Sequence, residues 1–539
     1  MKRTLLILFS LAQVGLVSET AHAVNRLVTY FGDGGGGSLR LVIQGACEDP
    51  GDDVINFVTV SEVHIALESP LKIPAWCDGK VTINGLPGVE TILNGAAIPP
   101  AVAFQEKAAM DEVPGILQVM TAKNEIRGLT FVGFKDGAGI TLMGHDNLVE
   151  DNFFGIYRKT DTFKPNRFGM VISGDGNTIT KNTLTGNDEE GILMDGHDNV
   201  IQGNLVGTKN GLCPLFFSSP KEDGFSYMRE LIYLASSSWM PMISDVPEGC
   251  GNGGSGVQLV HHASGNVIGG ESDAEGNTIV YNEGDGITLM GDGTGNFHSR
   301  NVIAGNQGLP VNINWDSKIN KGEKYVVGTN AGIPTLDFTA TPLDLAKDVF
   351  AYRLTGKGVV GATAEIYLAP ADGQGALAFL EAFVIPESPF SHDLADPELS
   401  PGRVISALVC DEEKNCSELS SVALDRDVDH DGLLDSHELE KSSSSCWHDD
   451  TDGDGLEDSL EDTNLSGKQD AGETASYLSD TDDDGLSDFV ETGGDGKYDP
   501  QLGDTDPLNS DTDGDGLADG EEDKNYDGII QLGESSPLE

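Results

Sequence analysis

The stretch Asn177-Thr-Ile-Thr-Lys-Asn-Thr-Leu-Thr-Gly contains the pattern that is repeated through the first half of this chain. Related phrases of Asn, β-branched residues and Gly begin at Asn124, Asn147, Asn199, Asn277 and Asn301. Consecutive phrases are 22 to 24 residues apart where the repeat is clearest. Apolar phrases of the type Gly-Ile-Thr-Leu-Met lie between them and begin at Gly139, Gly191, Gly256 and Gly286. A fixed period in this range indicates a solenoid with one supersecondary unit per turn.

The composition of each period favours a coil of β-strands. Short runs that alternate inward and outward residues are separated by Gly and Asn, as expected for strands and turns. Asn tolerates left-handed backbone angles and can stack in ladders with the coils above and below. The pattern over about 50–320 resembles right-handed parallel β-helix proteins. A leucine-rich repeat has a similar period, but the repeats lack its Leu-x-x-Leu-x-Leu phrase. We therefore predict a mostly β protein with a right-handed parallel β-helix over residues 24–325.

Two segments modify this coil. An open sheet edge at the end of a solenoid needs a cap, and Ser38-Leu-Arg-Leu-Val-Ile43 fits a short amphipathic helix there. It is similar to the Cys-Ser-Leu-Arg-Glu-Ala-Ile segment that opens many secreted bacterial β-helix proteins, although Gly37 replaces the Cys. The segment near 209–250 breaks the rhythm and predicts an insertion. Such an insertion can carry a binding site or simply pack over the coil flank.

Residues 330–425 lose the Asn-Gly rhythm and predict a small β-sandwich. Alternating strands are expected at 364–369, 378–385 and 404–410, and the stretch from Cys410 to Cys416 reads as a hairpin turn closed by a disulfide. The following Ser417-Glu-Leu-Ser-Ser resembles the ending of small immunoglobulin-like sandwiches found after β-helices. The resemblance implies an Ig-like spacer without its own chemistry.

The last module repeats a 12-residue frame, first seen as Asp427-x-Asp429-x-Asp431-Gly432-x-x-Asp435-x-x-Glu438. The frame returns at 450–461, 480–491 and 511–522, and variants occupy 462–473 and 523–534. It offers oxygen ligands at positions 1, 3 and 5, a backbone carbonyl at 7, a water-bridging ligand at 9 and a bidentate Glu at 12. Gly stands at position 6 in all six loops because the sharp turn requires positive φ. Carboxylates without His or Cys indicate Ca²⁺ as the bound ion.

The predicted calcium ligands, in chain order, are Asp427, Asp429, Asp431, Leu433, Asp435, Glu438, Asp450, Asp452, Asp454, Leu456, Asp458, Glu461, Asp462, Asn464, Ser466, Lys468, Asp470, Glu473, Asp480, Asp482, Asp484, Leu486, Asp488, Glu491, Asp511, Asp513, Asp515, Leu517, Asp519, Glu522, Asp523, Asn525, Asp527, Ile529, Gln531 and Glu534.

The junctions between the loops exclude paired EF-hands, which need a helix on each side of every loop. Glu461 is followed at once by Asp462, and Glu522 by Asp523. The alternation of full and variant loops over 426–539 resembles the thrombospondin type 3 repeat. That resemblance implies a chain wound around calcium ions, with little regular structure and almost no apolar core. The stretch 493–506 departs from this pattern because it has several Asp residues but no complete 12-residue frame.

Charge agrees with cation binding. Residues 425–539 hold 37 acidic and 5 basic residues, so 37 − 5 = 32 of the 57 net negative charges lie in this segment. Such a density opposes a compact state unless cations neutralise it, so we expect the segment to be ordered with calcium and extended or disordered without it. It also argues against nucleic acid as a partner, because nucleic acid needs a basic face.

The first 23 residues predict a signal peptide. Lys2-Arg3, an apolar run from Leu5 to Val17 and Ala21-His-Ala23 form its three regions. No other apolar stretch is long enough to span a membrane, so we expect an exported protein without a transmembrane segment. The seven cysteines suit an oxidising compartment, and proximity suggests the pairs 47–77, 213–250 and 410–416, with Cys446 left over.

Two functions remain open. The preferred interpretation is an exported, adhesin-like calcium-binding protein whose β-helix presents a face to a glycan or protein ligand. The alternative is a secreted polysaccharide lyase or glycoside hydrolase, because β-helix families include such enzymes and hydrolysis needs two carboxyls. The candidate catalytic residues are Asp188, Glu190 and Asp195. A phrase that recurs at Gly144-His-Asp-Asn and Gly196-His-Asp-Asn is expected to be a turn of the coil and not an active site.

Overall fold

The computed structural model describes residues 23–99, 110–160, 162–208, 250–313, 329–343, 351–370, 373–396, 399, 403–425, 427, 429, 431–440, 444–445 and 447–538. The predicted signal peptide, the insertion over 209–249 and Cys446 lie outside these residues. No helix within the described ranges is both long and apolar enough to cross a membrane.

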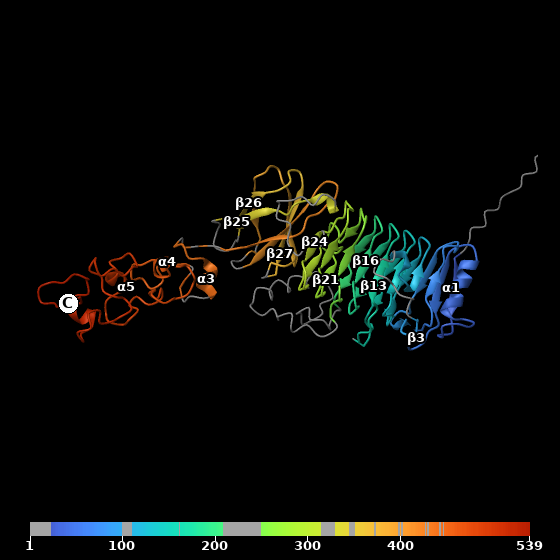
Figure 1. The fold of residues 1–539 in the computed structure, drawn as a ribbon, viewed down its shortest axis with the longest axis horizontal. Coiled ribbons are helices and arrows are strands. Elements are labelled where there is room, and N and C mark those ends of the chain that lie inside the picture. Colours follow the sequence, from blue (N-terminus) through green and yellow to red (C-terminus); the bar gives the residue numbers. More distant parts are fainter. Residues whose placement is uncertain are drawn as a thin grey trace, which may run out of the picture. The chain divides into compact units, whose positions relative to one another are not determined.

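Three parallel sheets of eight strands each form a β-helix, as predicted (Figure 1). The first sheet contains β1 (Val24–Val28), β2 (Asp53–Phe57), β5 (Val81–Asn84), β8 (Glu125–Arg127), β11 (Leu148–Glu150), β14 (Thr178–Thr180), β17 (Val200–Gln202) and β20 (Val267–Ile268). The second contains β3 (Val63–Ala66), β6 (Thr91–Asn94), β9 (Leu129–Val132), β12 (Phe153–Phe154), β15 (Thr183–Leu184), β18 (Leu205–Val206), β21 (Thr278–Val280) and β23 (Val302–Ala304). The third contains β4 (Leu71–Ile73), β7 (Gly115–Val119), β10 (Ala138–Leu142), β13 (Phe168–Ile172), β16 (Ile192–Met194), β19 (Val257–Leu259), β22 (Ile287–Leu289) and β24 (Val311–Ile313).

The register stacks equivalent apolar side chains inside the coil. Ile126, Val149, Ile179 and Ile201 occupy partner positions on successive strands of the first sheet, and all four are fully buried. In the second sheet, the rings of Phe131 and Phe154 stack with centroids 5.1 Å apart. Because each coil offers only a few inward positions, burial depends on the coils above and below.

Three buried ladders of Asn side chains hold the corners of the coil. In each ladder, the Oδ1 of one Asn accepts hydrogen bonds from the preceding Asn, with N···O distances of 2.8–3.3 Å. One ladder lies at the corner that precedes the strands of the first sheet and contains Asn124, Asn147, Asn177, Asn199, Asn266 and Asn296. The ladder before the second contains Asn152, Asn182, Asn204 and Asn277. The ladder before the third contains Asn166, Asn187, Asn252 and Asn282.

The repeated Asn phrases therefore do not all occupy the same sheet. Asn177 precedes β14 in the first sheet, whereas Asn277 precedes β21 in the second. At both corners an Asn is followed two positions later by a buried apolar residue, Ile179 after Asn177 and Ile279 after Asn277, so the phrases look alike in sequence. The Gly-His-Asp-Asn phrases are turns, as expected, since Asp146 and Asp198 have φ of 53° and 55°.

The predicted helix near the start is present as α1 (Leu39–Glu48). The hydroxyl oxygen of Ser38 accepts a hydrogen bond from the backbone amide of Leu41, which satisfies one of the free N–H groups of the first turn. Its buried face includes Ile43 and packs against strands of the first coils. The predicted disulfide between Cys47 and Cys77 is confirmed.

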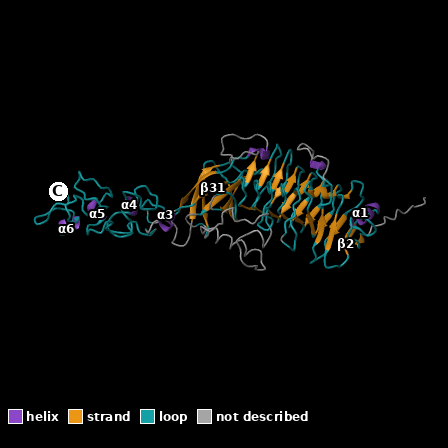
Figure 2. Ribbon diagram, turned by 60° about the horizontal axis from the view of Figure 1, so that its bottom comes forward, coloured by secondary structure: helices purple, strands orange, loops and turns teal. Residues whose placement is uncertain are grey.

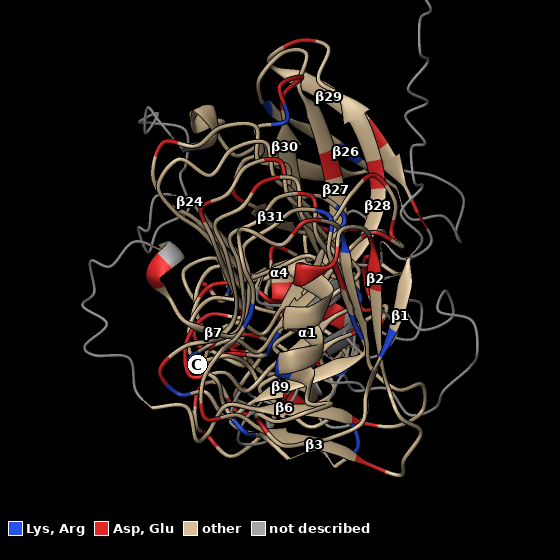
Figure 3. Cartoon of the chain, turned by 90° about the vertical axis from the view of Figure 1, so that its right-hand side faces the viewer, with Lys and Arg blue, Asp and Glu red and all other residues tan. Residues whose placement is uncertain are grey.

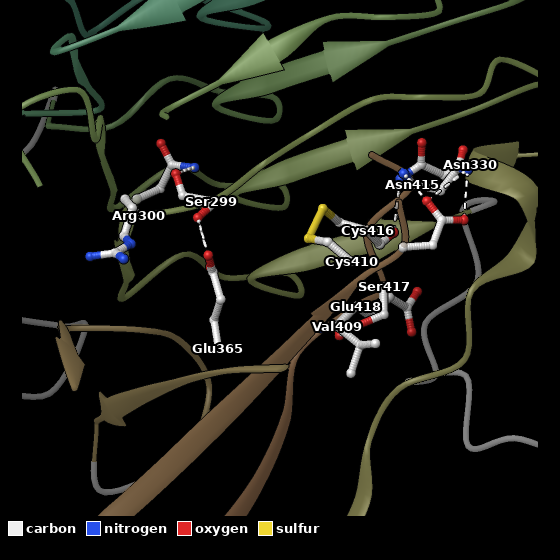
Figure 4. The surroundings of a disulfide bond; sticks show 12 residues. Ser299, Arg300, Asn330, Glu365, Val409, Cys410, Asn415, Cys416, Ser417 and Glu418 are labelled. Atoms are coloured by element: carbon white, nitrogen blue, oxygen red, sulfur yellow. Dashed lines mark hydrogen bonds between the residues drawn. A yellow bond between two sulfur atoms is a disulfide. The ribbon is translucent and has the colours of Figure 1, made fainter. Parts of the chain in front are cut away.

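Two antiparallel sheets follow the coil. One contains β25 (Asp337–Pro342), β26 (Ala351–Lys357) and β29 (Phe390–Ala395), and the other contains β28 (Ala378–Val384), β27 (Thr363–Ala369), β30 (Val404–Cys410) and β31 (Ser420–Ala423). They bury a common core that includes Tyr352, Leu394, Ile366 and Ile405. The predicted Cys410–Cys416 disulfide closes the hairpin after β30 (Figure 4). Cys250 is disulfide-bonded, but its predicted partner Cys213 lies outside the described residues.

The C-terminal segment has little regular structure, as predicted (Figure 2). Its helices are α3 (Asp435–Glu440), α4 (Asp458–Glu461), α5 (Asp488–Glu491) and α6 (Asp519–Glu522). The last three are single turns that run from position 9 to position 12 of a loop. In each of these turns the acidic residues at both ends are buried. Figure 3 shows the Asp and Glu residues of the chain in red.

Candidate metal centres

One hydrogen bond closes each of the six 12-residue loops. The amide of the Gly at position 6 donates to a carboxylate oxygen of the Asp at position 1, with N···O distances of 2.5–3.1 Å. All six glycines have φ between 72° and 112°. A side chain at this φ would be strained, which explains why the frame requires Gly at position 6.

A second hydrogen bond orients the Asp at position 5. In five loops its Oδ1 accepts the amide of position 7, at 2.7–2.9 Å. The residue at position 7 is Leu in the four full loops. Leu433, Leu456 and Leu486 are buried, whereas Leu517 in the last full loop is 44% exposed.

The carboxylates at positions 1, 3 and 5 converge in each of the four full loops. One oxygen from each of the three side chains lies within 4.8 Å of the other two, so the group could hold a metal ion. The triads are Asp427–Asp429–Asp431, Asp450–Asp452–Asp454, Asp480–Asp482–Asp484 and Asp511–Asp513–Asp515. The sequence frame thus brings these predicted ligands together.

Buried oxygens in these loops fit a cation. Among the described residues, no hydrogen-bond partner is found for Oδ2 of Asp452 and Asp513 or for Oε2 of Glu491 and Glu522. Burying an ionised oxygen without a partner is costly, and one divalent cation in each loop would offset that cost. The donor set contains only oxygen, which is the preference of Ca²⁺ and Mg²⁺ and not of transition metals.

The Glu at position 12 is almost completely buried beside the Asp triad. Burial first, and the neighbouring carboxylates second, raise the pKa of Glu461 and of Glu491 to about 9. The same causes raise the pKa of Asp482 to about 7. A cation within the group would oppose these shifts because it favours the ionised form. The arrangement is therefore electrostatically suited to a divalent ion.

The Asp at position 9 has a role that the sequence did not indicate. We expected this Asp to reach the ion through water. In three loops, however, its two oxygens accept hydrogen bonds from the backbone amide and the hydroxyl of the Thr at position 2. The pairs are Thr451–Asp458, Thr481–Asp488 and Thr512–Asp519, with distances of 2.6–3.0 Å. The recurrence of Thr at position 2 was the available signal. This pair fixes the start of the loop against its final helical turn.

In the variant loops, the side chains at ligand positions make hydrogen bonds with other residues of the same loop. In loop 462–473, Oε1 of Glu473 accepts bonds from Thr463 and Asn464, and Oε2 accepts the amide of Asp470. Within the described part of the chain, no group of three acidic side chains converges in loop 462–473 or in loop 523–534. These loops offer a weaker set of ligands than the full loops.

The candidate catalytic residues lie at the two ends of strand β16. Asp188 and Glu190 precede the strand, and Asp195 follows it and lies 3.3 Å from His261. Glu190 and Asp195 are five positions apart along an extended segment, which corresponds to about 16 Å and exceeds the ~5–10 Å that separates the carboxyls of a glycosidase. Burial raises the pKa of Glu190. The geometry thus brings Asp188 and Glu190 to one end of the strand but not Asp195.

Comparisons with known proteins give limited matches. Residues 101–224 match a family described as periplasmic copper-binding protein (NosD), which is less than half of the chain. No curated protein matches. A crystal structure of a mutant of the periplasmic alginate epimerase AlgG is 12% identical, with a TM-score of 0.23, 49% of this chain covered and 53% of that chain covered. The chain thus spans about half the length of that protein.

Full-length tailspike protein 2 of the Escherichia coli O157:H7 bacteriophage CAB120 is 10% identical, with a TM-score of 0.20. The match covers 75% of this chain and 68% of that chain.

Proposed function

We propose that this chain is an exported calcium-binding protein whose C-terminal loops are ordered by calcium and whose β-helix presents an elongated face to a glycan or protein ligand. The observation that carries the proposal is the convergence of three carboxylates in each full loop beside a buried Glu. Loops of this kind in extracellular modules bind calcium with Kd of roughly 10⁻⁴ to 10⁻³ M. The disulfides Cys47–Cys77 and Cys410–Cys416 support export, because such bonds persist in oxidising compartments.

A matched pair of variants tests calcium binding in one loop. Asp482→Asn removes a carboxylate of the triad, whereas Asp483→Asn removes the same charge from an exposed neighbour at position 4 that belongs to no triad. Calorimetric titration of the full chain should show weaker binding or fewer bound ions for Asp482→Asn and an unchanged titration for Asp483→Asn. Equal effects of the two changes would mean that charge density, and not a site, attracts the ion.

Order in the C-terminal segment is the second readout. Chelation should lower the compactness of the full chain in small-angle scattering, because carboxylates without a cation repel one another. Magnesium should restore it poorly, since it prefers a smaller octahedral site with retained waters. A scattering curve that does not change with chelation would contradict the proposal.

The adhesin-like role is tested with the full chain on a glycan array, in calcium and in chelator. Binding without turnover is the expected result. A secreted lyase or glycoside hydrolase is the alternative function, and one observation favours it. Glu190 lies close in sequence to Asp188 and has a raised pKa, as a general acid requires. Turnover of acidic or neutral polysaccharides that Glu190→Gln abolishes would favour the enzyme.

A further inference from the structure

Successive full loops are joined by a recurring hydrogen bond. Oδ2 of Asp454, at position 5 of loop 450–461, accepts the amide of Phe489, at position 10 of loop 480–491, at 2.8 Å. Oδ2 of Asp484 accepts the amide of Gly520, at position 10 of loop 511–522, at 3.2 Å. The bonded residues are 35 and 36 positions apart, so loops 450–461 and 480–491 each bond to the next full loop, past the variant loop or the irregular stretch between them.

This bond places the position 9 carboxylate of one loop beside the ligands of the preceding loop. Position 9 directly precedes the amide that donates the bond, so Asp519 lies next to Asp484. One oxygen each from Asp484, Glu491 and Asp519 lies within 4.8 Å of the other two. Asp519 is fully buried, and Glu491 is 1% exposed.

The remaining contacts of these side chains leave one buried oxygen of Glu491 without a hydrogen-bond partner among the described residues. Oε1 of Glu491 accepts the hydroxyl of Thr505 at 3.0 Å, but Oε2 has no hydrogen-bond partner among the described residues and is buried. Asp519 accepts two bonds from Thr512, which fixes its carboxylate while leaving further lone pairs. Two of the three close carboxylates are buried and Asp484 is partly buried, so a cation between them would offset the cost of their burial and repulsion.

We propose that Asp484, Glu491 and Asp519 hold one calcium ion at the junction of loops 480–491 and 511–522, with Asp519 acting on the preceding loop. The proposal rests on the calcium-binding function above and adds a ligand set that crosses between loops. It implies that calcium binding in loop 480–491 depends on a residue outside that loop. The ion would therefore link the two loops and couple their order.

Hydrogen–deuterium exchange of the full chain, measured by mass spectrometry over a calcium titration, separates this role from a local one. Asp519→Asn removes the crossing carboxylate. Asp513→Asn removes a ligand that belongs only to loop 511–522. The readout is the calcium concentration at which amides of residues 480–491 become protected.

For Asp519→Asn we expect this concentration to rise at least as much as the ~10–100-fold that removing an outer-shell partner of a metal site produces. The control variant Asp513→Asn should change residues 511–522 and leave 480–491 within about threefold of the unmodified protein. The inference is overturned if Asp519→Asn alters only its own loop, or if Asp513→Asn shifts 480–491 equally. If the unmodified chain shows no calcium-dependent protection, the calcium-binding function itself fails.

Discussion

The substitution Asn182→Ala should destabilise the coil far more than an ordinary surface change. Asn182 is fully buried in the ladder before the second sheet. Its Oδ1 accepts the amide and the side-chain NH₂ of Asn152, both at 3.0 Å. Its Nδ2 donates to the carbonyl oxygens of Val149 and Thr180 and to Oδ1 of Asn204, at 2.9–3.1 Å. Alanine removes all five of these hydrogen bonds.

The magnitude follows from what remains unpaired. A typical internal hydrogen bond contributes a net ~1 kcal/mol, and a buried group that loses its partner costs about 1–3 kcal/mol. The Asn152 side chain keeps two carbonyl acceptors, but its backbone amide loses the acceptor seen in the ladder. We therefore expect the free energy of unfolding to fall by about 4 kcal/mol, which is large beside the ~5–15 kcal/mol stability of a typical domain.

Urea unfolding followed by circular dichroism measures this loss, and hydrogen exchange locates it. Exchange should rise first in the adjacent coils, since solenoid repeats interact with their nearest neighbours. The control is Lys181→Ala, one residue away, where a 68% exposed side chain makes only a surface ion pair with Glu150. That control should change stability by no more than ~0.5 kcal/mol. A loss below about 1 kcal/mol for Asn182→Ala would refute the ladder as a major source of stability.

Three further outcomes are expected in the C-terminal segment. In calorimetric titrations, Gly485→Ala should weaken calcium binding in its loop more than Gly516→Ala does. Both glycines have φ above 100°, but only at Gly485 would the new Cβ lie 3.0 Å from the Tyr526 ring. Equal effects of the two changes would mean that the loss of binding free energy comes entirely from backbone strain, which costs about 1–3 kcal/mol. Thr481→Val removes the 2.7 Å bond to the buried carboxylate of Asp488 and should lower the stability of the calcium-bound loop by about 1.5–3 kcal/mol, measured by hydrogen exchange. An unchanged exchange rate would argue against the Thr–Asp pair as a clamp. Finally, salt should partly restore compactness to the calcium-free segment in small-angle scattering, because the Debye length falls from about 10 Å at 0.1 M to about 3 Å at 1 M; no response to salt would exclude repulsion as the cause of expansion.

The sequence by itself determined the local features of this protein. The 22–24-residue period predicts a β coil because each turn must place the same residue types inside and at the corners. The 12-residue frame predicts the carboxylate triads for a similar reason: positions 1, 3, 5 and 6 lie within one short turn, where spacing alone fixes which groups meet. The two nearby cysteine pairs at 47–77 and 410–416 could be predicted because short separations favour contact.

Only the tertiary structure decided how distant repeats combine. Asn199 bonds to Asn266, 67 residues later, because strand β20 pairs in register with strand β17. The phrases at Asn177 and Asn277 have the same pattern yet enter different sheets, since the corners impose similar local requirements. Asp519 belongs by spacing to its own loop, and the bond from Gly520 to Asp484 brings it to the preceding one. A local pattern fixes the groups within one turn of the chain, whereas contacts between turns depend on how the whole chain packs.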